Sequence, residues 1–248
     1  MTAPPGAQLW LLAEESVEAE VARYAAGLLS TDERRRLERL RPPDGRRRFL
    51  GARLLCRTVL GELLGRPPAA LRFVRGGLGR PELDPNPWGV RFSVSHTRGL
   101  VGCLVSWDGP CGLDVEQAVA AEPVVRHGER WLAPAERARL SALAPGRRAR
   151  SFTDLWVLKE AYTKALGTGF QHRFDGFRLG PDEHGRIVLE DPSVPPEDVS
   201  RWRFALLSVS GGHRLAVAVR RDGAGDTPWS APRPRYLDPR TVVAGAGR

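Results

Sequence analysis

Three acidic residues and one lysine stand at spacings that could bring them together for chemistry on phosphate groups. In Gly112-Leu113-Asp114-Val115-Glu116, the period-two alternation predicts a short strand that places both carboxylates on one face. Glu160 and Lys164 are one turn apart on a predicted helix, so they share a face as well. Three hard oxygen ligands that leave positions for water and phosphate oxygens are typical of Mg²⁺. A nearby ammonium could neutralise charge developing on a phosphoryl oxygen.

The segment from Trp156 to Gly169 contains both lysines of the chain, Lys159 and Lys164. Its apolar residues recur at helical spacing, a capping box is expected at Ser151 and Asp154, and Gly167 and Gly169 can end the helix. An exposed Glu–Lys pair worth a few tenths of a kcal/mol is the competing interpretation of this helix. The Asp-x-Glu pattern is also common by chance, so neither segment is decisive alone.

The first half of the chain offers a histidine and a cluster of arginines. Ser95 and His96 follow the alternating strand pattern of residues 90–95, where a lone histidine is more often an ordinary loop residue. Eight arginines lie between Arg34 and Arg48. A solvated helix face and a phosphate site explain them about equally well.

Composition narrows the possible partners. The chain has 248 residues, 42% of them hydrophobic, and a formal charge of +9, which indicates an anionic partner without choosing its class. Three cysteines without a Cys-x-x-Cys pair are expected to be reduced, buried side chains. With no apolar run of membrane-spanning length and no signal-peptide pattern, we expect a soluble, cytoplasmic protein.

The order of predicted elements divides the chain into two similar halves. An apolar helix is followed by strands in each half, at 50–64 and at 152–166, and Trp88–His96 loosely echoes Trp202–Ser210. We therefore expect an α+β fold with an N-terminal lobe over 1–110, a C-terminal lobe over 111–221 and a ligand cleft where they join. Residues 222–248, rich in Gly, Pro and Arg, are expected to form a flexible tail.

Several common site classes lack their patterns here. The chain has no His-x-x-x-His, no Walker glycine loop and no Gly-x-Gly-x-x-Gly in a βαβ setting, which argues against a zinc hydrolase, a P-loop NTPase and a dinucleotide dehydrogenase. A basic nucleic-acid-binding protein remains an alternative, although the arginine cluster has no array of stacking aromatics.

The motifs in order resemble a known family. Gly79-Arg80-Pro81, Phe92-Ser-Val-Ser-His96, Gly112-Leu-Asp-Val-Glu116 and Trp156-x-x-Lys159-Glu160-Ala161-x-x-Lys164-x-x-Gly167-x-Gly169 resemble those of the 4′-phosphopantetheinyl transferases of the surfactin-synthetase-activating type. The resemblance covers roughly residues 31 to 220. Its last two motifs are specific in combination, and the first two support them.

The resemblance implies a reaction, a fold and partners. Members of this family transfer the 4′-phosphopantetheine arm of coenzyme A, their substrate, to a serine of an apo acyl or peptidyl carrier protein, with Mg²⁺, and release adenosine 3′,5′-bisphosphate. The fold it implies is a pseudo-dimer of two similar α/β lobes with the active site at the lobe interface. It implies an acidic carrier protein as partner, no nucleic acid or membrane, and a monomer.

Site residues follow from the resemblance position by position. Asp114, Glu116 and Glu160 match the Mg²⁺-binding acids, and Glu160 also matches the proposed general base for the serine. Lys164 matches the lysine that faces the pyrophosphate, and His96 matches a histidine on a coenzyme A phosphate. The full expected set is catalytic Glu160, Lys164, His96 and Asp114, and coenzyme A-binding Arg36, Arg47, Arg48, Gly79, Arg80, Pro81, Ser95, His96, Asp114 and Lys164.

Two details of that assignment stay open. Arg80 stands where the family more often has lysine, and the register of Arg36, Arg47 and Arg48 around the 3′-phosphate is uncertain by about one residue. Lys159 has no assigned role, and we expect it on a different helix face with a structural or carrier-contacting role. A homologue that binds coenzyme A without catalysis is a further alternative, against which the intact acids and Lys164 argue.

Overall fold

The computed structural model describes residues 6–222 and 229–246 and divides into two compact units. The first combines the chain up to Trp107 with the residues from Pro232 onward, and the second spans Asp108–Ala231. No helix in the described part of the chain is both long and apolar enough to cross a membrane.

The first unit is built on a four-stranded sheet in the order β11-β1-β5-β4. Its long strands β1 (Ala7–Ala13), β5 (Leu100–Ser106) and β4 (Arg91–Thr97) are antiparallel neighbours, and β5 is buried along its whole length. The smaller elements of this unit are η1 (Glu14–Ser16), α1 (Ala19–Gly27), α2 (Thr31–Arg39), η2 (Pro68–Ala70), β2 (Phe73–Arg75), η3 (Gly77–Gly79) and β3 (Pro81–Leu83).

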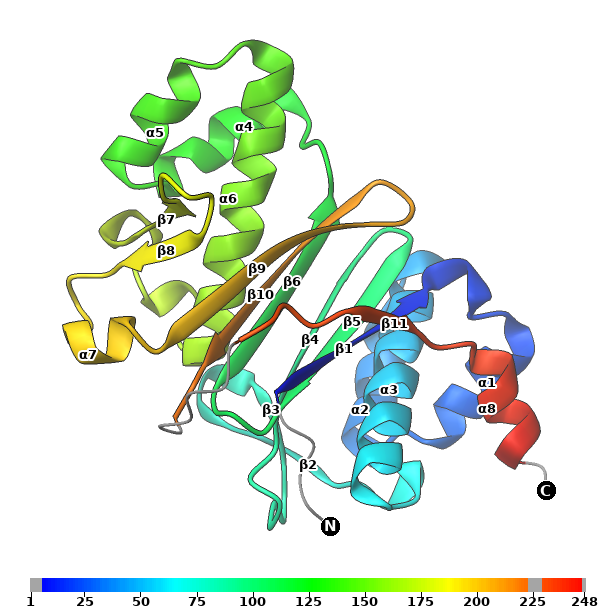
Figure 1. Ribbon diagram of the computed structural model, residues 1–248. Helices are drawn as coiled ribbons and strands as arrows, with labels where there is room; N and C mark the ends of the chain where they lie inside the picture. The colour runs from blue at the N-terminus through cyan, green and yellow to red at the C-terminus, as the bar shows by residue number, and fades with distance from the viewer. Residues whose placement is uncertain (1–5, 223–228, 247–248) are drawn as a thin grey trace. The chain divides into compact units, whose positions relative to one another are not determined.

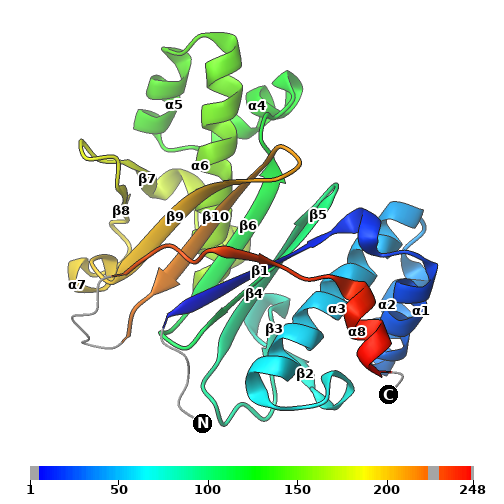
Figure 2. The same ribbon diagram turned by 45° about the vertical axis from the view of Figure 1, so that its right-hand side comes forward.

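The helix α3 (Pro43–Leu64) packs on this sheet and supplies more of the unit's buried core than any other element (Figure 2). Pro43 occupies the first turn, where a missing N–H costs nothing, and Gly65 ends the helix in the left-handed conformation at φ 63°. The preceding helix α2 is opened by a capping box of Ser30 and Glu33 and ends at Arg39.

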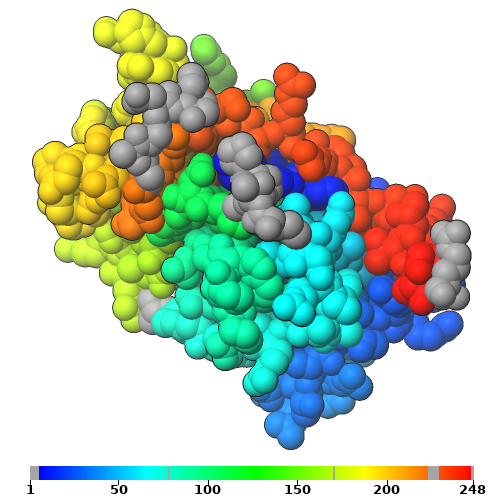
Figure 3. All heavy atoms as spheres, turned by 60° about the horizontal axis from the view of Figure 1, so that its bottom comes forward, coloured from blue at the N-terminus to red at the C-terminus, as the bar shows by residue number. Residues whose placement is uncertain are grey.

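The C-terminal residues differ from the flexible tail that composition predicts. Strand β11 (Pro234–Tyr236) pairs in parallel with β1, and α8 (Pro239–Ala246) contacts α1. Figure 3 shows these red residues against the blue N-terminal ones. Leu237, Val242 and Val243 pack against the core of the first unit. Residues 223–228 and 247–248 of the expected tail lie outside the described residues.

The second unit places one long helix across a three-stranded antiparallel sheet (Figure 1). The strands β6 (Cys111–Gln117), β10 (His213–Arg220) and β9 (Trp202–Val209) follow the order β6-β10-β9, and the helix is α6 (Pro145–Leu166). The other elements of this unit are α4 (Glu122–Gly128), η4 (Glu129–Trp131), α5 (Pro134–Ser141), η5 (Gly169–Gln171), η6 (Phe174–Gly176), β7 (Arg178–Pro181), β8 (Ile187–Glu190) and α7 (Pro196–Val199).

The start of α6 corrects the expected capping box at Ser151. Ser151 lies inside the helix, which already begins at Pro145. An alanine, Ala144, holds the N-cap position, so proline at the first helical position opens this helix. Its end is as predicted, with Gly167 in the left-handed conformation at φ 74°.

A glycine lets α6 approach β6 closely. A Cβ placed on Gly112 would lie 1.9 Å from the carbonyl oxygen of Ala161 and 2.6 Å from the amide nitrogen of Ala165. Both of these atoms belong to helix backbone, which cannot move aside as a flexible side chain can. The absence of a side chain at Gly112 therefore sets the distance between the strand and the helix that carry the candidate site.

We predict that Gly112→Ala lowers the free energy of unfolding by about 1–3 kcal/mol or more, because overpacking forces α6 away from β6. Urea unfolding followed by circular dichroism measures this change. Gly146→Ala in the first turn of α6 is the matched control, since nothing lies within 4 Å of its Cβ position. The control is expected to be neutral or stabilising, and an equal loss in both variants would contradict the close-approach argument.

Candidate active site

Strand β6 and helix α6 bring an acid and a base into direct contact. Asp114 lies on the same strand face as Gly112, so its carboxylate points at α6, and it is only 4% exposed. Lys164 Nζ donates to Asp114 Oδ1 at 2.5 Å. The lysine thus bonds an acid on the neighbouring strand, which the sequence spacing along the helix could not reveal.

Glu160 lies one turn before Lys164 and is partly buried. The pKa of Glu160 is raised to about 7, chiefly by burial and also by the negative charges of Asp114 and Glu116, while the positive charge of Lys164 opposes this rise. The three carboxylates therefore lie close enough to repel one another. A carboxyl group with a pKa near 7 can hold or release a proton at neutral pH.

The donor set suits a hard cation, although the side chains do not form a ready-made metal site. Across residues 6–222 and 229–246, no group of three or more His, Cys, Asp or Glu side chains stands in metal-ligating geometry. The three carboxylates nevertheless supply only oxygen ligands, and their mutual repulsion is the condition that a divalent cation relieves. These residues therefore fit Mg²⁺ chemically, with the Lys164–Asp114 bond as a competing contact.

Lys159 points away from these acids into the interior of the second unit. Its side chain is fully buried, and Nζ lies 2.9 Å from Oε2 of Glu136. Burial lowers the pKa of Lys159, and the charge of Glu136 partly offsets that effect. The contact gives Lys159 a structural role and excludes direct contact with a carrier. Sequence reasoning missed Glu136, because nothing in the pattern of α5 marks it as the partner of a lysine in another helix.

The first unit carries the remaining residues of the expected set. On β4, Ser95 is buried and His96 is exposed, whereas an alternation that buries Val90, Phe92 and Val94 predicts the reverse for this pair. Gly79 adopts φ +80° at the end of η3, where glycine avoids strain. Arg80 donates from Nη2 to the carbonyl oxygen of Phe92 at 3.1 Å, and Pro81 begins β3. This hydrogen bond connects the Gly-Arg-Pro segment to β4.

The arginines expected near a 3′-phosphate have different surroundings. Arg48 Nη1 lies 3.2 Å from Glu14, so a carboxylate already neutralises it, whereas Arg47 is exposed. Arg36 lies over the ring of Phe49, with its guanidinium carbon 5.7 Å from the centroid. Burial lowers the pKa of Arg36, and the positive charges of Arg53, Arg75 and Arg39 lower it further. Positive charge is therefore concentrated around Arg36.

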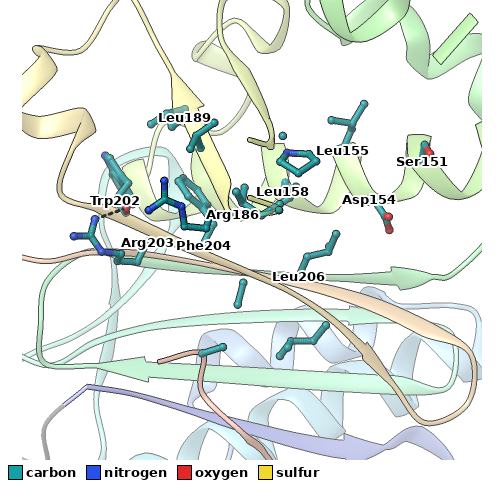
Figure 4. Close-up of a pocket in the computed structure, with 18 of the residues that line it drawn as sticks. Ser151, Asp154, Leu155, Leu158, Arg186, Leu189, Trp202, Arg203, Phe204 and Leu206 are labelled. Carbon is teal, nitrogen blue, oxygen red and sulfur yellow. Dashed lines mark hydrogen bonds between the residues drawn. The ribbon is translucent and has the colours of Figure 1, made fainter. Parts of the chain in front are cut away.

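A pocket of about 1110 Å³ lies elsewhere in the second unit (Figure 4). Its walls come from α6, β8 and β9 and include Leu155, Leu189, Trp202, Phe204 and Leu206. None of the three acids lines it, nor does Lys164. Pocket size therefore does not identify the chemistry in this unit, and the convergence of charged side chains on β6 and α6 does.

We predict that Glu160→Gln stabilises the metal-free protein above neutral pH. The native state holds a proton on Glu160 up to about pH 7, while an unfolded chain releases it near 4.5, so the free energy of unfolding falls as pH rises through this window. The two pKa values cap the effect at about 3 kcal/mol.

Urea unfolding in EDTA at pH 8 and at pH 4.5 measures this difference in the free energy of unfolding between Glu160→Gln and the wild type. The variant should be the more stable protein at pH 8 and should match the wild type at pH 4.5. Glu197→Gln on the exposed α7 is the control, with an expected change below about 0.5 kcal/mol at both pH values. A wild type as stable as Glu160→Gln at pH 8 would contradict the burial argument.

The chain is similar to known proteins. The family model of the 4′-phosphopantetheinyl transferase superfamily matches residues 110–218, which hold all three acids and Lys164. The 4′-phosphopantetheinyl transferase of Bacillus subtilis is 28% identical over 67% of this chain and 74% of its own. A holo-(acyl-carrier-protein) synthase structure from Bacillus anthracis is 24% identical, with a TM-score of 0.39, over 46% of this chain and 96% of its own.

The relationship extends over nearly the whole chain in another relative. The 4′-phosphopantetheinyl transferase HetI of Nostoc sp. is 32% identical over 222 residues, which is 89% of this chain and 89% of HetI. At this identity and coverage, the chain belongs to the 4′-phosphopantetheinyl transferase family.

Proposed function

We propose that this chain transfers the 4′-phosphopantetheine arm of coenzyme A to a serine of an apo acyl or peptidyl carrier protein and releases adenosine 3′,5′-bisphosphate. The observation that carries the proposal is the arrangement on β6 and α6. Lys164 Nζ lies 2.5 Å from Asp114 Oδ1, beside a glutamate whose pKa is about 7. An ammonium among carboxylates is suited to a pyrophosphate that must be bound together with its counter-ion.

The transfer step makes one bond and breaks another at the same phosphorus. The serine oxygen bonds to the phosphorus that carries the pantetheine arm. The bond from this phosphorus to the oxygen of the bisphosphate breaks, and its electron pair leaves with that oxygen. Glu160 takes the serine proton, directly or through a water. Because serine holds its proton far more tightly than a carboxylate with a pKa of about 7, the proton moves only as the new bond forms.

Asp114, Glu116 and Glu160 would hold Mg²⁺ at this site. When bound, the ion would supply Lewis-acid stabilisation of the charge on the pyrophosphate oxygens. Lys164 then contributes a second positive charge to the same oxygens, which requires it to exchange its bond with Asp114 for one with the substrate. Glu160 must be deprotonated to act either as a ligand or as a base.

Coenzyme A contacts are proposed for residues of the first unit. Arg36 is the best supported of the arginines, because Arg53, Arg75 and Arg39 concentrate positive charge around it. Arg48 is less well supported, because Glu14 already neutralises it. The proposed contacts also include Arg47, the segment Gly79-Arg80-Pro81, Ser95 and the exposed His96.

The finer proposal is a transferase of the surfactin-synthetase-activating type, with two similar lobes in one chain acting as a monomer. It is supported by the likeness of the two units, each of which packs a 22-residue helix on a sheet whose long strands are antiparallel and ends that helix at a left-handed glycine. An acidic carrier partner is supported by the net charge of +9.

Intact-mass spectrometry tests the activity. Purified protein with coenzyme A, Mg²⁺ and a panel of apo acyl and peptidyl carriers should give carriers heavier by one phosphopantetheine group. EDTA should abolish the gain and excess Mg²⁺ should restore it. Unchanged masses across the whole panel would refute the proposed function.

We predict that Glu160→Gln and Asp114→Ala each lower kcat/KM for the carrier by about 100-fold or more, since each removes a charge required by the transition state. Initial rates of carrier modification measure this loss, with circular dichroism to confirm folding. Glu197→Gln, an exposed carboxylate of the same unit, should retain the wild-type rate. Wild-type rates in both site variants would refute the assignment of these acids.

A further inference from the structure

The ammonium of Lys159 has an unusually complete set of partners inside the second unit. Nζ donates to the backbone carbonyls of Phe174 and Phe177, each at 2.7 Å, and pairs with Glu136 Oε2 at 2.9 Å. The side chain is 0% exposed. All three protons of the ammonium therefore have acceptors, and two of these acceptors belong to backbone.

Glu136 is equally well satisfied. Its Oε2 also accepts from the amide of Ala133 at 2.8 Å, and its Oε1 accepts from the amide of Leu179 at 3.0 Å. The pair connects the start of α5, the middle of α6, η6 and the beginning of β7. Of these, α5, α6 and β7 are neighbours in Figure 1. A single interaction thus fixes four segments of one unit relative to one another.

Packing alone does not explain a buried ion pair at this position. Burying two charges carries a desolvation cost, and apolar residues of similar volume often stabilise a core equally well. Apolar packing is not directional, however, whereas hydrogen bonds to backbone carbonyls fix where the lysine must point. Because side chains are about 100° apart around a helix, the direction of Lys159 also sets that of its neighbour Glu160.

A second buried contact lies on the same side of α6 as Lys159. Tyr162 Oη donates to Asp191 Oδ2 at 2.9 Å, and His172 Nε2 lies 2.7 Å from the same oxygen. Lys159 and Tyr162 are three residues apart and therefore lie on the same side of the helix. Glu160 and Lys164 project instead toward the acids of β6. The buried bonds on one side of α6 hold the helix in the rotation that presents Glu160 and Lys164 on the other side.

We propose that the Lys159–Glu136 pair is a positioning device for Glu160, which holds α6 in the rotation that places this carboxylate beside Asp114 and Glu116. Lys159 and Glu136 are positioning residues, since neither touches the acids themselves. The inference rests on the proposed function, in which these three carboxylates bind Mg²⁺. Its consequence is that weakening a buried pair on the far side of α6 lowers the affinity for the metal.

The test compares Mg²⁺ binding by the wild type, Lys159→Met and the nearly isosteric Glu136→Gln. Calorimetric titration of each metal-free protein with MgCl₂ gives the affinity without turnover, and transfer rates over a range of Mg²⁺ give the half-saturating concentration and kcat. We expect both variants to bind Mg²⁺ at least about fivefold more weakly and to have a raised half-saturating Mg²⁺ and a lower kcat. Glu136→Gln keeps the volume of the site, so it carries the test if Lys159→Met does not fold.

Leu140→Ala is the matched control. Leu140 is buried in α5 near the same pair, and its truncation should destabilise the unit by about 2–5 kcal/mol without altering any charge. Measurements are made at a temperature where circular dichroism shows every protein folded. Wild-type Mg²⁺ affinity in a folded Glu136→Gln would overturn the inference, and so would an equal loss in Leu140→Ala. Absence of transfer and of Mg²⁺ binding in the wild type would instead refute the proposed function.

Discussion

The second unit depends on one close contact between a strand and a helix. At Gly112 the backbone of α6 lies where any side chain would be, and the facing helix positions are the small residues Ala161 and Ala165. Only this short separation lets Lys164, on one element, bond Asp114 on the other at 2.5 Å. The contact between Asp114 and Lys164 therefore depends on the absence of a side chain at Gly112, two residues before Asp114.

This contact determines the electrostatics as well as the packing. Carboxylates brought together under a helix lose water and repel one another, and the pKa of Glu160 rises to about 7 as a result. A protein selected for stability alone would avoid such a group. The unit compensates through fully hydrogen-bonded charges elsewhere, in particular Glu136, which accepts from two backbone amides besides Lys159. Unfavourable charge at the site thus coexists with satisfied charge in the core.

Much of this arrangement could be predicted from the sequence, and the rest could not for definite reasons. Alternation along 112–116 placed Asp114 and Glu116 on one face, and helical spacing placed Glu160 beside Lys164, because both patterns are local. The partner of Lys164 and the burial of Lys159 depend on contacts between distant segments, which no local pattern specifies. The predicted start of α6 at Ser151 was wrong for a local reason, since the helix begins instead with proline at its first position and has no serine cap.

The C-terminal strand has a consequence for how the chain is made. Because β11 pairs with β1, the sheet of the first unit is complete only after residues 234–236 have been synthesised and have left the ribosome. The second unit is continuous in sequence and emerges in full before that moment, so it can fold while the first still has an open strand edge. During this interval β1 is a potential site of intermolecular pairing.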